Sequence, residues 1–329
     1  MRHVLPLLVL ALTPLAAQGD VVPRWLTNSP GSGDTNWPFG LATSCRVQYL
    51  YEASETGLLG PRTINAFEVR GEQNVANLAK SNIDLQIEMS QTPALMSTLS
   101  TTFANNRGTN HTVVFARRLV SMPATTAQII GAWSPPFVLD APFTYDPTGG
   151  DSLLIEYDVA TQPAGTWRVD CAWSATGVHS ALGTGCNGVN ATSSGGQIGG
   201  NLTIGCSGGT ANAPGALFIG TFEWPSPFPI PGSPGCFSFT SLDVVLPVAL
   251  SATGIYSFVL PVPNQQNLLG GPIYGQYGVV NNSFAIDTSP SRRIFLTDLD
   301  QIGRVHNTTS NASPTGTVQA RVALATRLQ

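Results

Sequence analysis

The sequence has little charge. Only 10% of its residues are Asp, Glu, Lys or Arg, whereas about a quarter is usual in globular proteins. No basic block or stripe is present that could neutralise phosphates, so nucleic-acid binding is not expected. Apolar residues still make up 42% of the chain, which is enough for a buried core and argues against disorder. Lys80 is the only lysine, a scarcity that we attribute to genome composition.

After the first segment of the chain, the sequence contains no long apolar run. That segment has a short basic beginning, an apolar run over residues 4–15 and two small residues at 16–17. This is the layout of a secretory signal peptide, and the run is too short for a stable helix across a bilayer. We therefore expect residues 1–19 to be a signal peptide. The mature protein is expected to be secreted or at the cell surface, without a membrane span.

The common motifs of catalysis are also missing. The sequence has no His-Glu-x-x-His metal motif, no Gly-x-Ser-x-Gly turn and no glycine loop followed by a helix that could hold phosphate. The histidines beyond the first segment, His111, His179 and His306, are far apart in the sequence. We expect no cofactor, with calcium as the one ion to test.

Two pairs of aspartates are candidates for calcium binding. Asp146 and Asp151 flank the segment Pro-Thr-Gly-Gly, where carboxylate oxygens on a flexible loop could bind the ion. The alternative is a tight turn in which Asp accepts backbone hydrogen bonds. Asp298 and Asp300 alternate along an expected strand and make a similar, weaker claim.

Three glutamates are candidates for acid–base hydrolysis of glycans, namely Glu88, Glu156 and Glu223. Such an enzyme needs two carboxyl groups within about 5–10 Å of each other. Nothing in the sequence brings any two of the three together. Because Glu88 and Glu156 alternate with apolar residues, we expect both to be solvated on an outer strand face.

What the sequence has in abundance is period-two alternation of apolar and polar residues, broken by turns rich in its 34 Gly and 25 Pro. Alternation places successive side chains on opposite faces of a sheet. The clearest runs cover residues 47–51, 83–89, 153–159, 167–173, 244–250 and 318–324. Many short strands at this spacing predict an all-β fold of two β-sandwich, jelly-roll-like domains in tandem.

The composition changes between residues 174 and 185, because all but one of the glutamates come earlier. We therefore expect an N-terminal jelly-roll-like β-sandwich over residues 20–178 and a C-terminal β-sandwich over residues 183–329. Residues 93–105 fit either one short helix or a loop with buried apolar anchors. Residues 222–235 contain five prolines and are expected to form an extended inter-strand loop.

Five cysteines are present, and in an oxidising compartment they favour disulfides over metal sites. By parity, Cys45 and Cys171 point to the core side of the first and last strands of the N-terminal domain, and we expect them to pair. Cys186 and Cys236 each follow a glycine where a strand is expected to begin. Their pairing would close a loop of 50 residues (236 − 186), for about 4 kcal/mol in the chain-entropy model. Cys206 is then a free thiol, and both pairings are hypotheses because sequence does not fix connectivity.

Three tryptophans are candidates for ligand binding. Trp25 and Trp37 lie in the polar N-terminal segment, and Trp224 lies in the proline-rich segment. An exposed tryptophan can stack on a sugar ring because it joins an apolar face to a polar rim. The alternative is that all three close the ends of the sandwiches.

Several stretches resemble a recurrent type of uncharacterised secreted protein of planctomycete-type bacteria. In the N-terminal part these are RVQYLYEASE, INAFEVRGE, LSTTFANNRGTNHTVVF and PFTYDPTGGDSLLIEYDV, and in the C-terminal part GTGCNG, ALFIG, GCF and IYGQYGVVN. The resemblance implies a jelly-roll-like domain followed by a small β-domain. It rests on turns, strand cores and cysteines, and it brings no catalytic residue. Cys45, Cys171 and Cys206 are additional to the pattern.

These features favour a secreted, non-catalytic structural or adhesive protein. The first alternative is a carbohydrate-binding module, in which Trp25, Trp37 or Trp224 forms an exposed platform. The second is a glycan-acting hydrolase, which requires two of the three glutamates to converge in a cleft. The expected partners are extracellular glycans or other cell-surface components.

Overall fold

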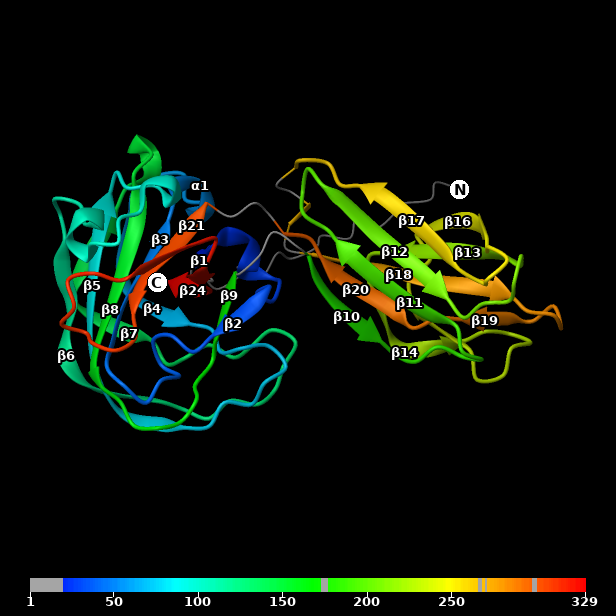
Figure 1. Cartoon of the computed structure of the whole chain (residues 1–329), viewed down its shortest axis with the longest axis horizontal. Coiled ribbons are helices and arrows are strands. Elements are labelled where there is room, and N and C mark those ends of the chain that lie inside the picture. The colour runs from blue at the N-terminus through cyan, green and yellow to red at the C-terminus, as the bar shows by residue number, and fades with distance from the viewer. Residues whose placement is uncertain (1–19, 173–176, 266–267, 270, 298–300) are drawn as a thin grey trace, which may run out of the picture.

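The computed structural model shows an almost entirely β protein, which confirms the expected all-β class (Figure 1). It describes residues 20–172, 177–265, 268–269, 271–297 and 301–329, so the expected signal peptide lies outside the described residues. The helices are single turns, namely η1 (Arg24–Thr27), α1 (Ala53–Thr56), η2 (Met96–Thr98), η3 (Phe103–Asn106) and η4 (Pro147–Gly149). No helix in the described part of the chain is long and apolar enough to cross a membrane.

Figure 1 shows two lobes. The first lobe comprises residues 20–172 and 301–329, and its largest sheet has the order β22-β21-β3-β8-β5-β6. These strands are β3 (Cys45–Tyr51), β5 (Lys80–Thr92), β6 (Thr112–Met122), β8 (Ser152–Thr161), β21 (Ile302–Asn307) and β22 (Thr317–Ala320). Its other strands are β1 (Asp20–Val22), β2 (Gly33–Thr35), β4 (Arg62–Val69), β7 (Phe137–Tyr145), β9 (Val169–Ala172), β23 (Ala323–Leu324) and β24 (Thr326–Leu328).

The smaller sheets of the first lobe have the orders β1-β24-β4-β7 and β2-β9-β23. All three sheets enclose one apolar core. The alternation read from the sequence sets which residues enter it. In β3, β5 and β8 the inward rows include Tyr49, Ile87 and Tyr157, each fully buried. The outer faces of these strands therefore carry the intervening polar residues.

The second lobe comprises residues 177–297 and has a separate apolar core. Its main sheet has the order β10-β20-β18-β13-β16, with β19 paired to β18, and the facing sheet is β11-β12-β17. A two-stranded hairpin, β14-β15, completes it. The strands are β10 (Val178–Leu182), β11 (Asn190–Gly195), β12 (Asn201–Ser207), β13 (Pro214–Gly220), β14 (Glu223–Pro229), β15 (Phe237–Thr240), β16 (Val244–Ala249), β17 (Tyr256–Pro261), β18 (Pro272–Val280), β19 (Ile286–Thr288) and β20 (Ser291–Phe295).

The end of the chain returns to the first lobe, which differs from the division expected at residues 183–329. β21 pairs with β3, β23 pairs with β9, and β24 lies between β1 and β4. Ile302, Leu324 and Leu328 are buried in the first core. Period-two alternation marks a strand but carries no information about which sheet the strand joins, so sequence reading assigned this segment to the preceding sandwich.

The proline-rich segment also differs from the expectation of an extended loop. Residues 223–229 form strand β14, which pairs with β15 through an irregular register between Glu223 and Phe228. Proline is compatible with a strand that has one unpaired edge. The segment over 93–105 contains two single-turn helices, η2 and η3, in place of one helix.

One of the two expected disulfides is present. Cys186 and Cys236 are bonded, as predicted, whereas Cys45, Cys171 and Cys206 are free and buried. The predicted Cys45–Cys171 bridge is wrong because their strands are not neighbours. Cys45 lies on β3 beside β8 and β21, and Cys171 lies on β9 between β2 and β23. Burial raises the pKa of the Cys45 thiol to about 12 and that of Cys206 to about 11, so both stay protonated.

Candidate functional site

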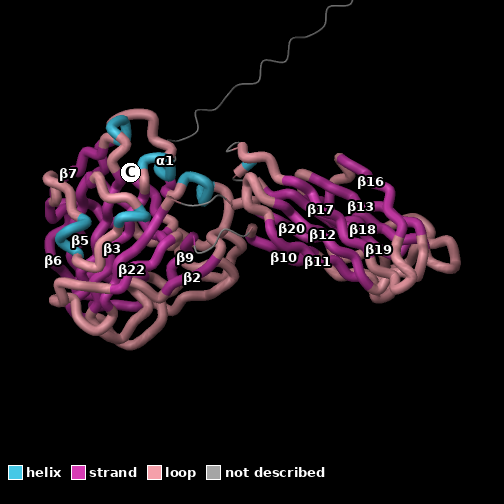
Figure 2. Tube along the Cα trace, turned by 45° about the horizontal axis from the view of Figure 1, so that its top comes forward, coloured by secondary structure: helices cyan, strands magenta, loops and turns pink. Residues whose placement is uncertain are grey.

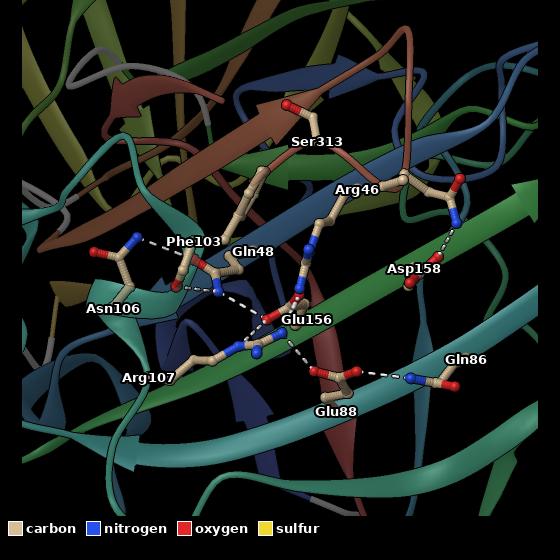
Figure 3. Close-up of polar contacts among 12 residues, drawn as sticks. Arg46, Gln48, Gln86, Glu88, Phe103, Asn106, Arg107, Glu156, Asp158 and Ser313 are labelled. Atoms are coloured by element: carbon tan, nitrogen blue, oxygen red, sulfur yellow. Dashed lines mark hydrogen bonds and ion pairs between the residues drawn. The ribbon is translucent and has the colours of Figure 1, made fainter. Parts of the chain in front are cut away.

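The candidate site lies on the outer face of the largest sheet of the first lobe. Glu88 on β5 and Glu156 on β8 are direct cross-strand neighbours there (Figure 3). The expectation that they face away from the core is correct, but they are not solvated: Glu88 is 7% exposed and Glu156 is 1% exposed. The segment over residues 95–111, which contains η2 and η3, supplies the side chains that cover this face.

Arg107 follows η3 and binds both carboxylates. Its Nη2 donates to Glu88 Oε2 at 2.7 Å and to Glu156 Oε1 at 2.8 Å, and its Nε donates to Glu156 Oε2 at 3.0 Å. Arg46 on β3 adds a second guanidinium, whose Nε lies 2.6 Å from Glu156 Oε1. The two carboxylates are therefore matched by two guanidinium groups within one network.

Uncharged side chains complete the network (Figure 3). Gln48 Nε2 donates to Glu156 Oε2 at 2.8 Å and to the carbonyl oxygen of Phe103 at 3.0 Å. Asn106 Nδ2 donates to Gln48 Oε1 at 3.0 Å, and Gln86 Nε2 donates to Glu88 Oε1 at 2.7 Å. These bonds join three strands of the sheet to the segment that covers it, so the network holds that segment in place.

The electrostatics of this site oppose acid catalysis. Burial alone would raise the pKa of Glu156, but hydrogen bonds from Arg107 and Gln48 and the charge of Arg46 outweigh it and lower that pKa. A glycosidase acid needs the opposite, a raised pKa that keeps a proton at neutral pH. Glu88 and Glu156 are the only two of the three candidate glutamates that meet among the described residues. Glu223 lies in the second lobe, paired with Arg293.

The same site has the composition of a partial metal site. His111 Nε2 lies 2.6 Å from Glu88 Oε2, and one ligand atom each of Glu88, His111 and Glu156 fall within 4.8 Å of one another. The guanidinium of Arg107 already contacts both carboxylates, so a metal ion would compete with a bound cation. The other such cluster in the described residues is Cys186, Cys236 and Asp287, whose sulfurs are joined in the disulfide.

The aspartates considered for calcium form a capped turn. Asp146 Oδ1 accepts from the backbone nitrogen and hydroxyl of Thr148, at 3.0 and 2.7 Å. Gln91 lies between the two aspartates, because its Nε2 donates to Asp151 Oδ2 and its Oε1 accepts from the Asp146 backbone nitrogen. Asp298 and Asp300 lie outside the described residues.

Two of the three candidate tryptophans are covered by other side chains. Trp25 is only 2% exposed. Trp37 is partly buried, and its ring centre lies 4.0 Å from the stacked His306 ring and 4.0 Å from Cζ of Arg304. His306 and Arg304 therefore occupy space over the indole that a sugar ring would need.

Trp224, the third candidate, has an exposed aromatic neighbour. It lies half-buried on β14, and its ring meets that of Phe222 edge to face at 4.9 Å and 87°. Phe222 is 47% exposed. The pair offers the kind of aromatic surface that was expected of a glycan-binding site.

Sequence reasoning missed the cations that organise the first lobe. Arg107 and Arg46 stand in unremarkable contexts, and no spacing rule connects them to the glutamates. Lys80 is another of these cations. Lysine is scarce in this sequence, which we attribute to genome composition. In the structure the Lys80 side chain is buried, and its ammonium group lies against oxygen atoms of four residues. Its Nζ lies 2.7 Å from Phe39 O, 2.5 Å from Leu41 O, 2.7 Å from Gln162 Oε1 and 3.2 Å from Gly165 O.

Neither a protein-family model nor a curated protein sequence matches this chain.

Proposed function

We propose that the protein acts outside the cell, or at its surface, as a non-catalytic structural or adhesive protein whose second lobe supplies the contact surface. The observation that carries the proposal is the composition of that lobe. Residues 177–297 include five charged residues: Glu223, Asp243, Asp287, Arg292 and Arg293. Two of these, Glu223 and Arg293, are paired with each other. The surface of the second lobe therefore carries almost no charge.

The second lobe also exposes many large apolar side chains. The exposed ones are Phe222, Phe228, Phe237, Leu242, Val244, Val245, Ile255, Val259, Phe284 and Ile286. Exposed apolar side chains mark a contact with another molecule where they gather into one patch. A surface that is apolar and nearly uncharged suits a partner that is itself uncharged, such as a neutral polysaccharide or a protein coat.

Two further observations support a non-catalytic role outside the cytoplasm. The acidic groups that meet in the first lobe are paired with arginines, and the pKa of Glu156 is lowered, whereas a catalytic acid needs a raised pKa. The Cys186–Cys236 disulfide fits an oxidising compartment, in keeping with the signal-peptide pattern and with the resemblance to secreted bacterial proteins.

A retention assay tests the proposal. The purified mature chain is incubated with isolated cell envelopes and with insoluble polysaccharides, and the bound fraction is measured with and without calcium. We expect the unchanged chain to be retained and the variant Phe228→Ser/Val259→Ser to lose most of its retention. The control Leu59→Ser/Leu119→Ser removes two exposed apolar side chains from the first lobe, at 99% and 64% exposure. Equal losses in both variants, or no retention of the unchanged chain, would contradict the proposal.

Glycan binding is the second candidate function, and the Trp224–Phe222 pair favours it. Saturable binding to one member of a glycan panel should be abolished by Trp224→Ala. Trp37→Ala is the matched control, because His306 and Arg304 already lie against that indole. Binding that survives Trp224→Ala would remove this candidate.

A further inference from the structure

Two edge strands of the second lobe, β16 and β17, lie on the same side of it. Among the described strands, β16 pairs only with β13 and β17 pairs only with β12, and Figures 1 and 2 place both on the same side of the lobe. On the opposite side the edge strands are β10 and β11, which His179 of β10 links to each other. Its Nδ1 lies 2.8 Å from Ser193 Oγ and its Nε2 lies 2.9 Å from the Gly195 carbonyl, both on β11.

The two open edges have the composition of strands that add to one another. β16 reads VVLPVA and β17 reads YSFVLP, and neither contains a charged residue. Val245 is 52% exposed and Val259 is 53% exposed. Uncharged, β-branched edge strands with free backbone groups are templates for pairing with a second chain. The first lobe differs, because its edge strand β6 carries Arg117 and Arg118, which pair with aspartates.

Hydrogen bonds show which residues of β16 face its open edge. The backbone nitrogen of Leu250 donates to the Ala213 carbonyl at 2.9 Å, across the ladder between β16 and β13. The backbone N–H and C=O groups of successive residues point alternately to the two sides of a strand. Those of the even-numbered residues of β16 therefore point toward β13. Those of Val245, Pro247 and Ala249 point toward the open edge. Pro247 has no N–H, so the middle of the open edge lacks a donor.

The edge strands β17 and β14 also have a proline whose backbone nitrogen points outward. Val262 donates to the Gly200 carbonyl at 2.9 Å, so the odd-numbered residues of β17, including Pro261, face outward. In the hairpin, Ile230 donates to the Cys236 carbonyl at 2.9 Å, which turns Pro229 of β14 outward. β16, β17 and β14 thus each have a proline where the backbone would otherwise offer a hydrogen-bond donor to a second chain.

We propose that Pro247 and Pro261, with Pro229 on the hairpin, block strand addition by a second copy of this chain and so keep an almost uncharged lobe from polymerising through its sheets. Charged side chains are the common protection of an edge strand, and proline is the alternative where charge is missing. The proposal concerns the sheet edges and goes beyond the adhesive function, since it holds whichever molecule the lobe contacts.

The test replaces the outward prolines of β16 and β17. We expect Pro247→Thr/Pro261→Thr to associate through the restored N–H groups, with a severalfold rise in the associated fraction over the unchanged chain in sedimentation velocity. Hydrogen exchange should show protection of the backbone amides introduced at positions 247 and 261 in the associated form. The control, Pro231→Thr/Pro234→Thr, removes two exposed prolines from the turn between β14 and β15 and should sediment like the unchanged chain.

Two outcomes overturn the proposal. The first is a double variant that keeps its disulfide and its circular dichroism spectrum, yet sediments like the unchanged chain. The second is association that arises from misfolding and not from strand pairing. To separate the two causes, Val245→Lys and Val259→Lys are added to the double variant. Lysine on an edge opposes strand pairing, so the proposal predicts a return to the sedimentation of the unchanged chain. Association that persists with both lysines present contradicts it.

Discussion

Glu88 and Glu156 face each other across β5 and β8, and one guanidinium, that of Arg107, binds both. Without that cation, two nearly buried carboxylates would oppose each other with only Arg46 and His111 nearby. We predict that Arg107→Ala lowers the free energy of unfolding by about 3–5 kcal/mol, the cost of removing one partner from a buried ion pair. Urea denaturation measures it.

Arg118→Ala is the control for that variant. Arg118 pairs with Asp140 on the surface, where both side chains are more than two-fifths exposed (41% and 44%). An exposed pair contributes about 0–1 kcal/mol. If the two variants lose the same stability, Arg107 has no special role in the first lobe.

Glu72 should make the protein less stable as the pH rises. It is buried, its Oε2 has no hydrogen-bond partner among the described residues, and burial with the charges of Asp170 and Asp34 raises its pKa to about 9. The unfolded chain releases this proton near pH 4.5, so the stabilising contribution is complete below that pH and is lost as the pH rises toward 9. Glu72→Gln should remove this dependence and add about 1–3 kcal/mol at mildly alkaline pH. Thermal melting across the pH range measures both, and parallel curves for the two proteins would refute the assignment.

His306 should act in the opposite direction. Burial and the neighbouring Arg304 charge lower its pKa from 6.5 to about 4. The unfolded chain therefore takes up the proton first, and the stabilising contribution is lost as the pH falls from 6.5 through 4. His306→Phe retains a ring against Trp37 and cannot be protonated. We expect a smaller fall in melting temperature on acidification than in the unchanged chain, and an identical fall would show that other groups dominate.

Lys80 provides a direct measure of opening in the first lobe. As the only lysine, it and the α-amino group are the two amines that can react with an acetylating reagent. Since the Lys80 side chain is buried among oxygen atoms, we predict that the native protein is acetylated at its N-terminus alone and that Lys80 reacts only on unfolding. Burial also lowers the pKa of Lys80 to about 8. Rapid acetylation of the folded chain at Lys80, detected by peptide mass spectrometry, would show that the oxygen atoms around the Lys80 ammonium separate from it readily.

Reduction of the disulfide should affect the second lobe alone. Cys186 and Cys236 are 50 residues apart, and closing such a loop contributes about 4 kcal/mol in the chain-entropy model. We predict that Cys186→Ser/Cys236→Ser destabilises the second lobe by roughly that amount. Because the lobes have separate cores, tryptophan fluorescence of the first lobe should keep its urea midpoint. A matching shift of both midpoints would mean that the lobes unfold as one unit.

Strand parity was sufficient for part of the fold, but not for the run 318–324, which breaks at Arg321 into β22 and β23 in two different sheets. It identified β3, β5 and β8, their inward rows, and the outward direction of Glu88 and Glu156. It failed wherever the result depended on which strand lies beside which. The predicted Cys45–Cys171 bridge assumed that two core-facing strands were neighbours, and the expected solvation of Glu156 assumed that nothing covered its face. The cover comes from Arg107 and Phe103, in a segment with no alternation to read.

Strands β21, β22, β23 and β24 come last in the chain but belong to the first lobe, and this sets an order of events in folding. The second lobe has all of its strands within residues 177–297, so it can form as soon as those residues emerge. The first lobe lacks a strand between β1 and β4 until residues 326–328 arrive. The half of the molecule that is made first is therefore completed last, and its unfinished sheet stays open while the rest of the chain is synthesised.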